Sequence, residues 1–212
     1  RPITTPVAIG GAGWGPWRSI CREQATRPGR PPLRDCLTVA EVRPEPGGRR
    51  LVLVQDGTGL RISVLRGTDG RLAEFAALRP DGTAPPADEA RDRLLAAWRD
   101  QFATLGLPPG RIAPREDFAM PVPGSPRGGT CRPEGLSTIA RRAVLVARCA
   151  VELAGNLGRT NSGAHVVIFA HVAIDVATGM HVAQNYATRI ETFAANGRSN
   201  GVVVTPSRVF LE

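Results

Sequence analysis

The histidines are the side chains in this sequence best suited to acid–base or metal chemistry, and there are three of them, His165, His171 and His181. His165 and His171 fall on the same side of one apolar, strand-like segment, six residues apart. At the rise of a β-strand that spacing is roughly 20 Å, so the two rings cannot bind one metal ion. The sequence therefore predicts no metal site built on this pair.

The third histidine has a candidate partner across a hairpin. If the chain turns at about Thr178, His181 lies opposite Asp175 on the adjacent strand. A carboxylate at that position would raise the pKa of the imidazole by favouring its charged form. We interpret this pair as a structural ion pair in preference to an acid–base or metal role. In the same register Asn185 lies opposite His171, which gives a polar row that could contact the headgroup of a ligand.

The segment Gly197-Arg198-Ser199-Asn200-Gly201 matches the G-x-S-x-G pattern of hydrolase nucleophiles. That chemistry needs the serine on a turn between a strand and a helix, with a histidine later in the chain. Here the strand-like Val202-Val203-Val204 follows, and every histidine precedes Ser199. The pattern indicates a hairpin turn, and no catalytic residue is predicted, so we expect a protein that is not an enzyme.

A second glycine-rich segment, Gly11-Ala12-Gly13-Trp14-Gly15, looks like a phosphate-binding loop only in composition. Such a loop follows a strand and opens a helix, and neither is predicted here. Residues 1–16 are rich in Pro, Gly, Thr and Ala, and we expect a flexible N-terminal arm. Trp14 and Trp17 are then either a hydrophobic plug against the domain, which we prefer, or an exposed recognition element.

The cysteines form two local pairs, Cys21 with Cys36 and Cys131 with Cys149. Other connectivities and free thiols remain alternatives, but each local pair closes a short loop. No C-x-x-C or Cys–His cluster has zinc spacing, so neither a metal nor another cofactor is expected. Two disulfides indicate an oxidising compartment, the periplasm or the cell exterior. The chain starts at Arg1 without methionine, which fits a mature exported chain, and an N-terminal membrane tether is compatible with this.

Composition restricts the class of protein. The 212 residues are 22% charged and 42% hydrophobic, which is typical of a soluble globular chain. The longest nearly uninterrupted apolar run, Ala164 to Ile174, is strand-sized, and no run reaches the ~20 residues of a transmembrane helix. All basic residues are arginine, which suggests a GC-rich bacterial genome. The net charge of +8 favours anionic partners, but the arginines are scattered and aromatics are scarce, so nucleic-acid binding is not expected.

The first half of the chain predicts an antiparallel meander. Strand candidates occur at residues 37–39, 51–54 and 60–64, and the last of them alternates apolar with polar residues. Pro46-Gly47-Gly48, Asp56-Gly57, Asp69-Gly70 and Asp81-Gly82 separate such segments, and Asp-Gly between alternating runs is a strong hairpin signal.

One helix is predicted over residues 87–105. Pro85-Pro86 precede it and Gly106 follows it, the expected asymmetry of helix ends. Its apolar stripe is expected to pack on a sheet and is formed by Ala87, Ala90, Leu94, Ala97, Trp98, Phe102 and Leu105.

The second half returns to strands after a Pro/Gly-rich loop at residues 106–136. Segments of strand length are Ala143–Leu153, Ala164–Val176, His181–Phe193 and Val202–Leu211, separated by turns at residues 156–163, 177–179 and 196–201. Helices do not alternate with these strands, which argues against a parallel α/β sheet. The predicted fold is a single, mainly β domain over residues 17–212, a curved antiparallel sheet or half-barrel packed on one amphipathic helix.

This layout resembles the bacterial envelope half-barrels, curved sheets that wrap a helix and include the periplasmic lipoprotein carriers. The matching residues are Leu107-Pro108-Pro109-Gly110-Arg111-Ile112, Arg115-Glu116-Asp117-Phe118 and the hairpin Ile174-Asp175-Val176-Ala177-Thr178-Gly179-Met180. The sequence departs from the pattern at Arg115, where a glycine is usual, and in its disulfides. The resemblance implies a concave sheet able to hold an apolar or lipid-like ligand, and it implies no catalytic residues.

The functional hypothesis is therefore a non-enzymatic periplasmic or envelope protein with an apolar ligand site between sheet and helix. One face of the strand at residues 164–176 is wholly apolar, and the other is mixed. Arginines at the rim could bind an anionic lipid headgroup. The alternative is a structural or protein-interaction module of the envelope, with an envelope protein as its partner. The expected ligand-binding residues are Trp98, Phe102, Val167, Phe169, His171 and Asn185.

Overall fold

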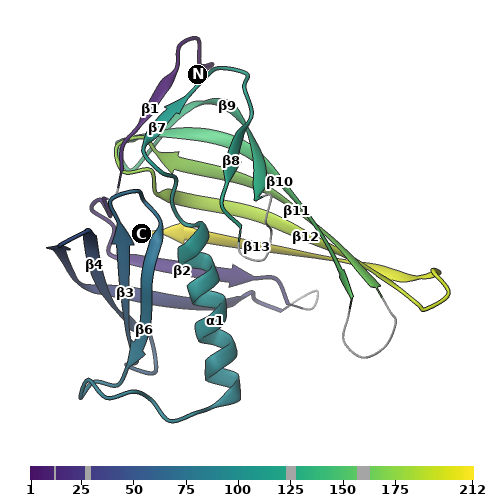
Figure 1. Ribbon diagram of the computed structural model, residues 1–212, viewed down its shortest axis with the longest axis horizontal. Coiled ribbons are helices and arrows are strands. Elements are labelled where there is room, and N and C mark those ends of the chain that lie inside the picture. The colour runs from purple at the N-terminus through teal and green to yellow at the C-terminus, as the bar shows by residue number, and fades with distance from the viewer. Residues whose placement is uncertain (12, 27–29, 123–127, 157–162) are drawn as a thin grey trace.

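Alternating apolar residues and Gly-containing turns produce one large antiparallel sheet in the computed structural model of this chain (Figure 1), which describes residues 1–11, 13–26, 30–122, 128–156 and 163–212. Strands account for 59% of the chain and helix for 8%, so the predicted mainly β fold is confirmed. The elements are β1 Val7–Ile9, β2 Ser19–Gln24, β3 Leu33–Glu45, β4 Gly48–Gln55, β5 Arg61–Gly67, β6 Leu72–Leu78, α1 Glu89–Thr104, β7 Gly110–Ile112, β8 Phe118–Met120, β9 Gly129–Ile139, β10 Arg142–Asn156, β11 Gly163–Asp175, β12 His181–Phe193 and β13 Ser199–Leu211.

The main sheet has eleven strands in the order β6-β5-β4-β3-β2-β13-β12-β11-β10-β9-β8, and each neighbouring pair is antiparallel. It is not closed into a barrel. Its two halves are meanders of consecutive strands, as predicted, and they meet where β2 pairs with β13. We call this junction, Ser19–Gln24 with Ser207–Leu211, the seam.

Helix α1 lies against one face of this sheet. Helix α1 begins after Asp88, whose carboxylate accepts a hydrogen bond from the backbone N–H of Arg91 at 2.8 Å, a regular N-cap. The predicted helix at residues 87–105 is thus confirmed with slightly shorter ends. Trp98 and Phe102 on its apolar stripe are buried against the sheet, and burial of large aromatics of this kind dominates the stability of a core.

Two hydrophobic clusters lie on the helix-bearing side. The first joins α1 to β2–β5 and includes Ile20, Leu37, Leu53 and Ile62, all fully buried. The second lies under β9–β11, where the N-terminal segment and β7 cover the sheet. The first cluster also includes Val182 of β12 and Val209 and Leu211 of β13, so the core around α1 extends into the second meander.

Residues 1–16, expected as a flexible arm, are packed on the domain. Val7–Ile9 form β1, which pairs with β7, and Val7 and Ile9 are buried. Trp14 and Trp17 are also buried, and the indole N–H of Trp14 donates to the carbonyl oxygen of Trp17 at 2.7 Å. The tryptophans thus act as the plug, and the arm differs from the expectation because its apolar residues find a partner strand.

The stretch at residues 106–136 is likewise more regular than the predicted loop. It contains β7, β8 and the first part of β9, which pairs with β10. Pro133 and Gly135 lie within β9, and these residue types obscured its period. The predicted turn at residues 156–163 falls mostly outside the described residues.

No helix in the described part of the chain has the length and apolarity needed to cross a bilayer.

Candidate ligand site

Strand alternation gives the main sheet two faces with different neighbours. We call the face that carries α1 the inner face and the opposite one the outer face. On β12 the side chain of Gln184 accepts a hydrogen bond from Gln101 of α1 at 2.9 Å, so even-numbered residues of β12 point inward. Asn185 and Ala187 therefore point outward. Their direct partners on β11, His171 and Phe169, share that face.

The predicted ligand-binding residues consequently do not form one site. Trp98 is fully buried in the core, where its indole N–H donates to Asp35 at 2.8 Å, and Phe102 packs 6.2 Å from it. Phe169, His171 and Asn185 lie on the outer face, away from the helix. The prediction of a single pocket between sheet and helix is corrected here, because the mixed side of β11 faces outward.

Phe169, His171 and Asn185 do lie together, in a groove on the outer face. Its volume is about 490 Å³, within the range of small-ligand sites. The strands β2, β11, β12 and β13 form its floor, so it crosses the seam. The lining residues are Glu23, Ala25, Pro32, Phe169, His171, Asn185, Tyr186, Ala187, Pro206, Ser207 and Arg208. We call this the outer groove. Val167, two residues from Phe169 on the same face, is half-buried and does not line it.

An apolar row runs across the floor of the outer groove. Phe169 pairs with Ala187 on β12, and Ala187 pairs with Pro206 on β13. The two small neighbours leave the ring of Phe169 uncovered, and the residue is 54% exposed. A phenyl ring flanked by short side chains offers an apolar surface to a ligand.

A polar row lies directly beside it. His171 pairs with Asn185, Asn185 with Arg208, and Arg208 with Glu23 across the seam. The register between His171 and Asn185 is the one predicted, and the row extends further than the sequence indicated. Amide, imidazole and guanidinium groups thus stand in line next to the apolar row.

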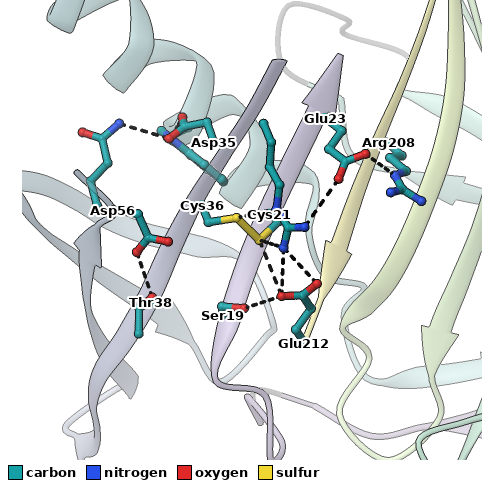
Figure 2. Close-up of a disulfide and its surroundings, with 12 residues drawn as sticks. Ser19, Cys21, Glu23, Asp35, Cys36, Thr38, Asp56, Arg208 and Glu212 are labelled. Atoms are coloured by element: carbon teal, nitrogen blue, oxygen red, sulfur yellow. Dashed lines mark hydrogen bonds and ion pairs between the residues drawn. A yellow bond between two sulfur atoms is a disulfide. The ribbon is translucent and has the colours of Figure 1, made fainter. Parts of the chain in front are cut away.

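Arg208 is held in this row by the buried carboxylate of Glu23. Its Nε donates to Glu23 at 2.6 Å, as Figure 2 shows across the seam. This hydrogen bond is the main reason that the pKa of Glu23 is lowered, with the charges of Arg208 and Arg34 adding to it. Because the bond uses Nε, the terminal nitrogens of Arg208 are not engaged by it and, among the described residues, are available as donors for a ligand.

A smaller groove of about 330 Å³ occupies the inner face beside α1. Arg22 and Asp35 line it, and both already serve the core: the guanidinium of Arg22 lies 4.8 Å from the Trp98 ring, and Asp35 accepts the Trp98 hydrogen bond. None of the predicted ligand-binding residues lines this groove. Its charged residues Arg22, Asp35 and Glu23 are engaged with other side chains, so the outer groove is the stronger candidate.

The predicted ion pair between His181 and Asp175 is wrong. A bulge shifts the register, so that Ala173 faces Ala183 while Ile174 faces His181. His181 is fully buried, and its Nδ1 lies 2.6 Å from the amide nitrogen of Gln184. Burial, together with the charge of Arg66, lowers the pKa of His181 to about 3 instead of raising it.

Asp175 has another partner. Its carboxylate, at the end of β11, lies 2.5 Å from Nε of Arg142, the first residue of the neighbouring strand β10. Ser199, the serine of the G-x-S-x-G segment, is exposed at the start of β13, after the turn that the sequence indicated. The described residues contain no group of His, Cys, Asp and Glu side chains that could hold a metal ion.

Both predicted disulfides are present. Cys21 bonds to Cys36 between β2 and β3, and Cys131 bonds to Cys149 between β9 and β10. Each pair is directly opposed in its strand register. They fit a location outside the reducing cytoplasm. The first lies beside the outer groove, on the seam strand β2 (Figure 2).

The sequence analysis missed Arg208, Pro206 and Glu23, which complete the outer groove. Pro206 and Arg208 enter it through the pairing of β12 with β13, whereas Glu23 enters it only because β13 pairs with β2, strands at opposite ends of the chain. Local periodicity carries no signal for that pairing.

Comparison of this chain with protein-family models, with curated proteins and with solved structures finds no match.

Proposed function

We propose that this protein is a non-enzymatic binding protein of the bacterial envelope that holds a small amphipathic, lipid-like ligand in the outer groove. The observation that carries the proposal is the pair of adjacent rows, one apolar around Phe169 and one polar ending at Arg208. An apolar chain would lie on Phe169, Ala187 and Pro206. Its polar or anionic head would then reach Asn185 and the terminal nitrogens of Arg208.

The half-barrel resemblance supports a ligand-holding sheet, but the proposed site is on the face opposite the helix. The disulfides support the envelope location. Among the described residues that line the groove we find no grouping of nucleophile, base and orienting residue: His171 lies opposite Asn185, and its Nδ1 is 3.8 Å from the carboxylate of Glu134. Binding without chemistry is therefore the function we infer.

The test is native mass spectrometry of protein purified from a bacterial periplasm, followed by organic extraction and lipid analysis. We expect a reproducible bound amphiphile that is lost in the Phe169→Arg variant. The control is Val42→Arg, at an exposed position on β3 beyond the residues of that strand that pair with β2, and it should retain the ligand. A protein that is free of ligand, or a Phe169→Arg variant that keeps it, would refute the proposal.

The second candidate function, a protein-interaction module, is favoured by one separate observation: among the described residues, Gly201–Thr205 of β13 pair with β12 and with no strand on the other side.

A further inference from the structure

Part of β13 pairs with a neighbouring strand on one side only, within the part of the chain that the structure describes. The strand pairs with β12 along nearly its whole length, from Ser199 to Phe210, but β2 covers only Ser207–Leu211. The hairpin of β12 and β13 projects past the end of β2 at the right of Figure 1. Among the residues that the structure describes, none pairs with the other edge of Gly201–Thr205.

The backbone groups on this edge can be assigned by alternation. The carbonyl oxygen of Pro206 accepts a hydrogen bond from the N–H of Ala25 at 3.1 Å, so residue 206 directs its backbone groups toward β2 and away from β12. Backbone direction alternates along a strand. The N–H and C=O groups of Val204 and Val202 therefore point to the same side, where β2 no longer runs.

The side chains do not protect this edge. Natural sheets block free edges with charges, prolines or bulges. Val202, Val203 and Val204 are 46%, 62% and 57% exposed, and the stretch Gly201–Thr205 has no charged residue. Pro206 ends the open stretch on one side, and the bulge at Asn200 ends it on the other. What remains is short, flat and apolar.

We propose that this edge pairs with the same edge of a second copy, so that two sheets join into one across a two-fold axis at Val203. In that antiparallel register Val202 lies opposite the partner's Val204, and each exchanges both backbone hydrogen bonds with the other. Gly201 lies opposite the partner's Thr205, and no charges meet.

A second copy fits this edge better than another extended segment would, because the edge is complementary to itself under a two-fold rotation. The backbone N–H and C=O groups of residues 202 and 204 lie opposite the C=O and N–H groups of residues 204 and 202 in the second copy. On the inner face Val203 stands beside Ile190, and both are exposed in the single chain. In the pair, the apolar row of Ile190 and Val203 would continue into the same row of the partner.

The test is sedimentation equilibrium of the intact chain, with Val204→Pro as the decisive variant. Proline removes an N–H that points to the open edge and none that bonds β12, so the fold should persist, as it does with Pro206 in the same strand. We expect the wild type to reach twice the chain mass of 22.5 kDa. The Val204→Pro dimer should have a dissociation constant raised at least about tenfold. The matched control Val204→Ala keeps the N–H and should remain a dimer. A wild type that stays monomeric, or a Val204→Pro variant that dimerises as tightly, overturns the proposal.

Two single cysteine variants test the register of the proposed strand pairing. Residue 203 lies opposite itself, at about 4.5 Å between Cα atoms in a pair without hydrogen bonds, which suits a disulfide. Val203→Cys should therefore form a covalent dimer on oxidation, whereas Thr205→Cys, opposite Gly201, should not. The reverse result contradicts this register. Dimerisation is independent of the ligand proposal, since the Phe169→Arg variant keeps the edge intact.

Discussion

The carboxylate of Asp175 is almost completely buried and lies 2.5 Å from Nε of Arg142, its main counter-charge. The backbone N–H of Ala177 donates to the other oxygen at 2.9 Å. Without the guanidinium of Arg142, the buried carboxylate would keep, among the described residues, the backbone N–H of Ala177 as its hydrogen-bond donor. We predict that Arg142→Met lowers the free energy of unfolding by about 3 kcal/mol, measured by urea denaturation followed by circular dichroism.

A matched exposed pair provides the control for that experiment. Arg132 and Asp117 are also close, at 2.8 Å, but their side chains are 66% and 41% exposed. Arg132→Met should cost less than about 1 kcal/mol. Equal losses of unfolding free energy in the two variants would mean that burial does not make the Asp175–Arg142 pair more important for stability than the exposed pair.

The two aromatic residues once expected in the same pocket should respond differently to truncation. Trp98 is fully buried and loses its hydrogen bond to Asp35 in Trp98→Ala, for which we expect a loss of about 3–5 kcal/mol. Phe169 is mostly uncovered, and Phe169→Ala should change stability by less than about 0.5 kcal/mol while weakening ligand binding. Urea unfolding curves of both variants check this, and a strongly destabilised Phe169→Ala would place that ring in the core.

His181 should make the fold sensitive to mild acid. Its folded-state pKa of about 3 lies below the ordinary value of 6.5, so the unfolded chain binds the proton more readily. Stability is then fully present above about pH 6.5 and falls as the pH decreases toward 3. Between pH 7 and pH 5 this residue alone should remove about 2 kcal/mol.

The variant His181→Asn isolates that contribution, because asparagine keeps an acceptor for Gln184 but does not titrate. Its unfolding free energy should fall less between pH 7 and pH 5 than that of the wild type. Parallel pH profiles for the two proteins would exclude His181 as the source.

Local signals in the sequence were sufficient for much of the fold. The proline pair and Gly106 placed the helix, the Gly-containing turns placed the hairpins, and the short loops paired the cysteines. The turn expected at about Thr178 also predicted the register of His171 with Asn185. These features depend on residues that are close in the chain, which is why they can be predicted from it.

The composition of the candidate site could not be predicted from the alternation of side chains along the strands alone. Alternation separates the two sides of β11 but does not say which side meets α1, so Phe169 was assigned to the wrong face. One extra residue in β12, Val182, moved His181 out of register with Asp175. The same limit applies to the seam, where Glu23 and Arg208 are 185 positions apart.

The seam also bears on how the chain reaches this structure. Each meander can assemble from neighbouring hairpins, but the sheet becomes continuous only when β13, later in the chain than every other strand, docks on β2 near its beginning. Contacts this distant in sequence form late and slowly. Until they form, both half-sheets present an open strand, and β13 of one molecule could dock on β2 of another. Strand exchange at high concentration is therefore the characteristic folding error we expect of this protein.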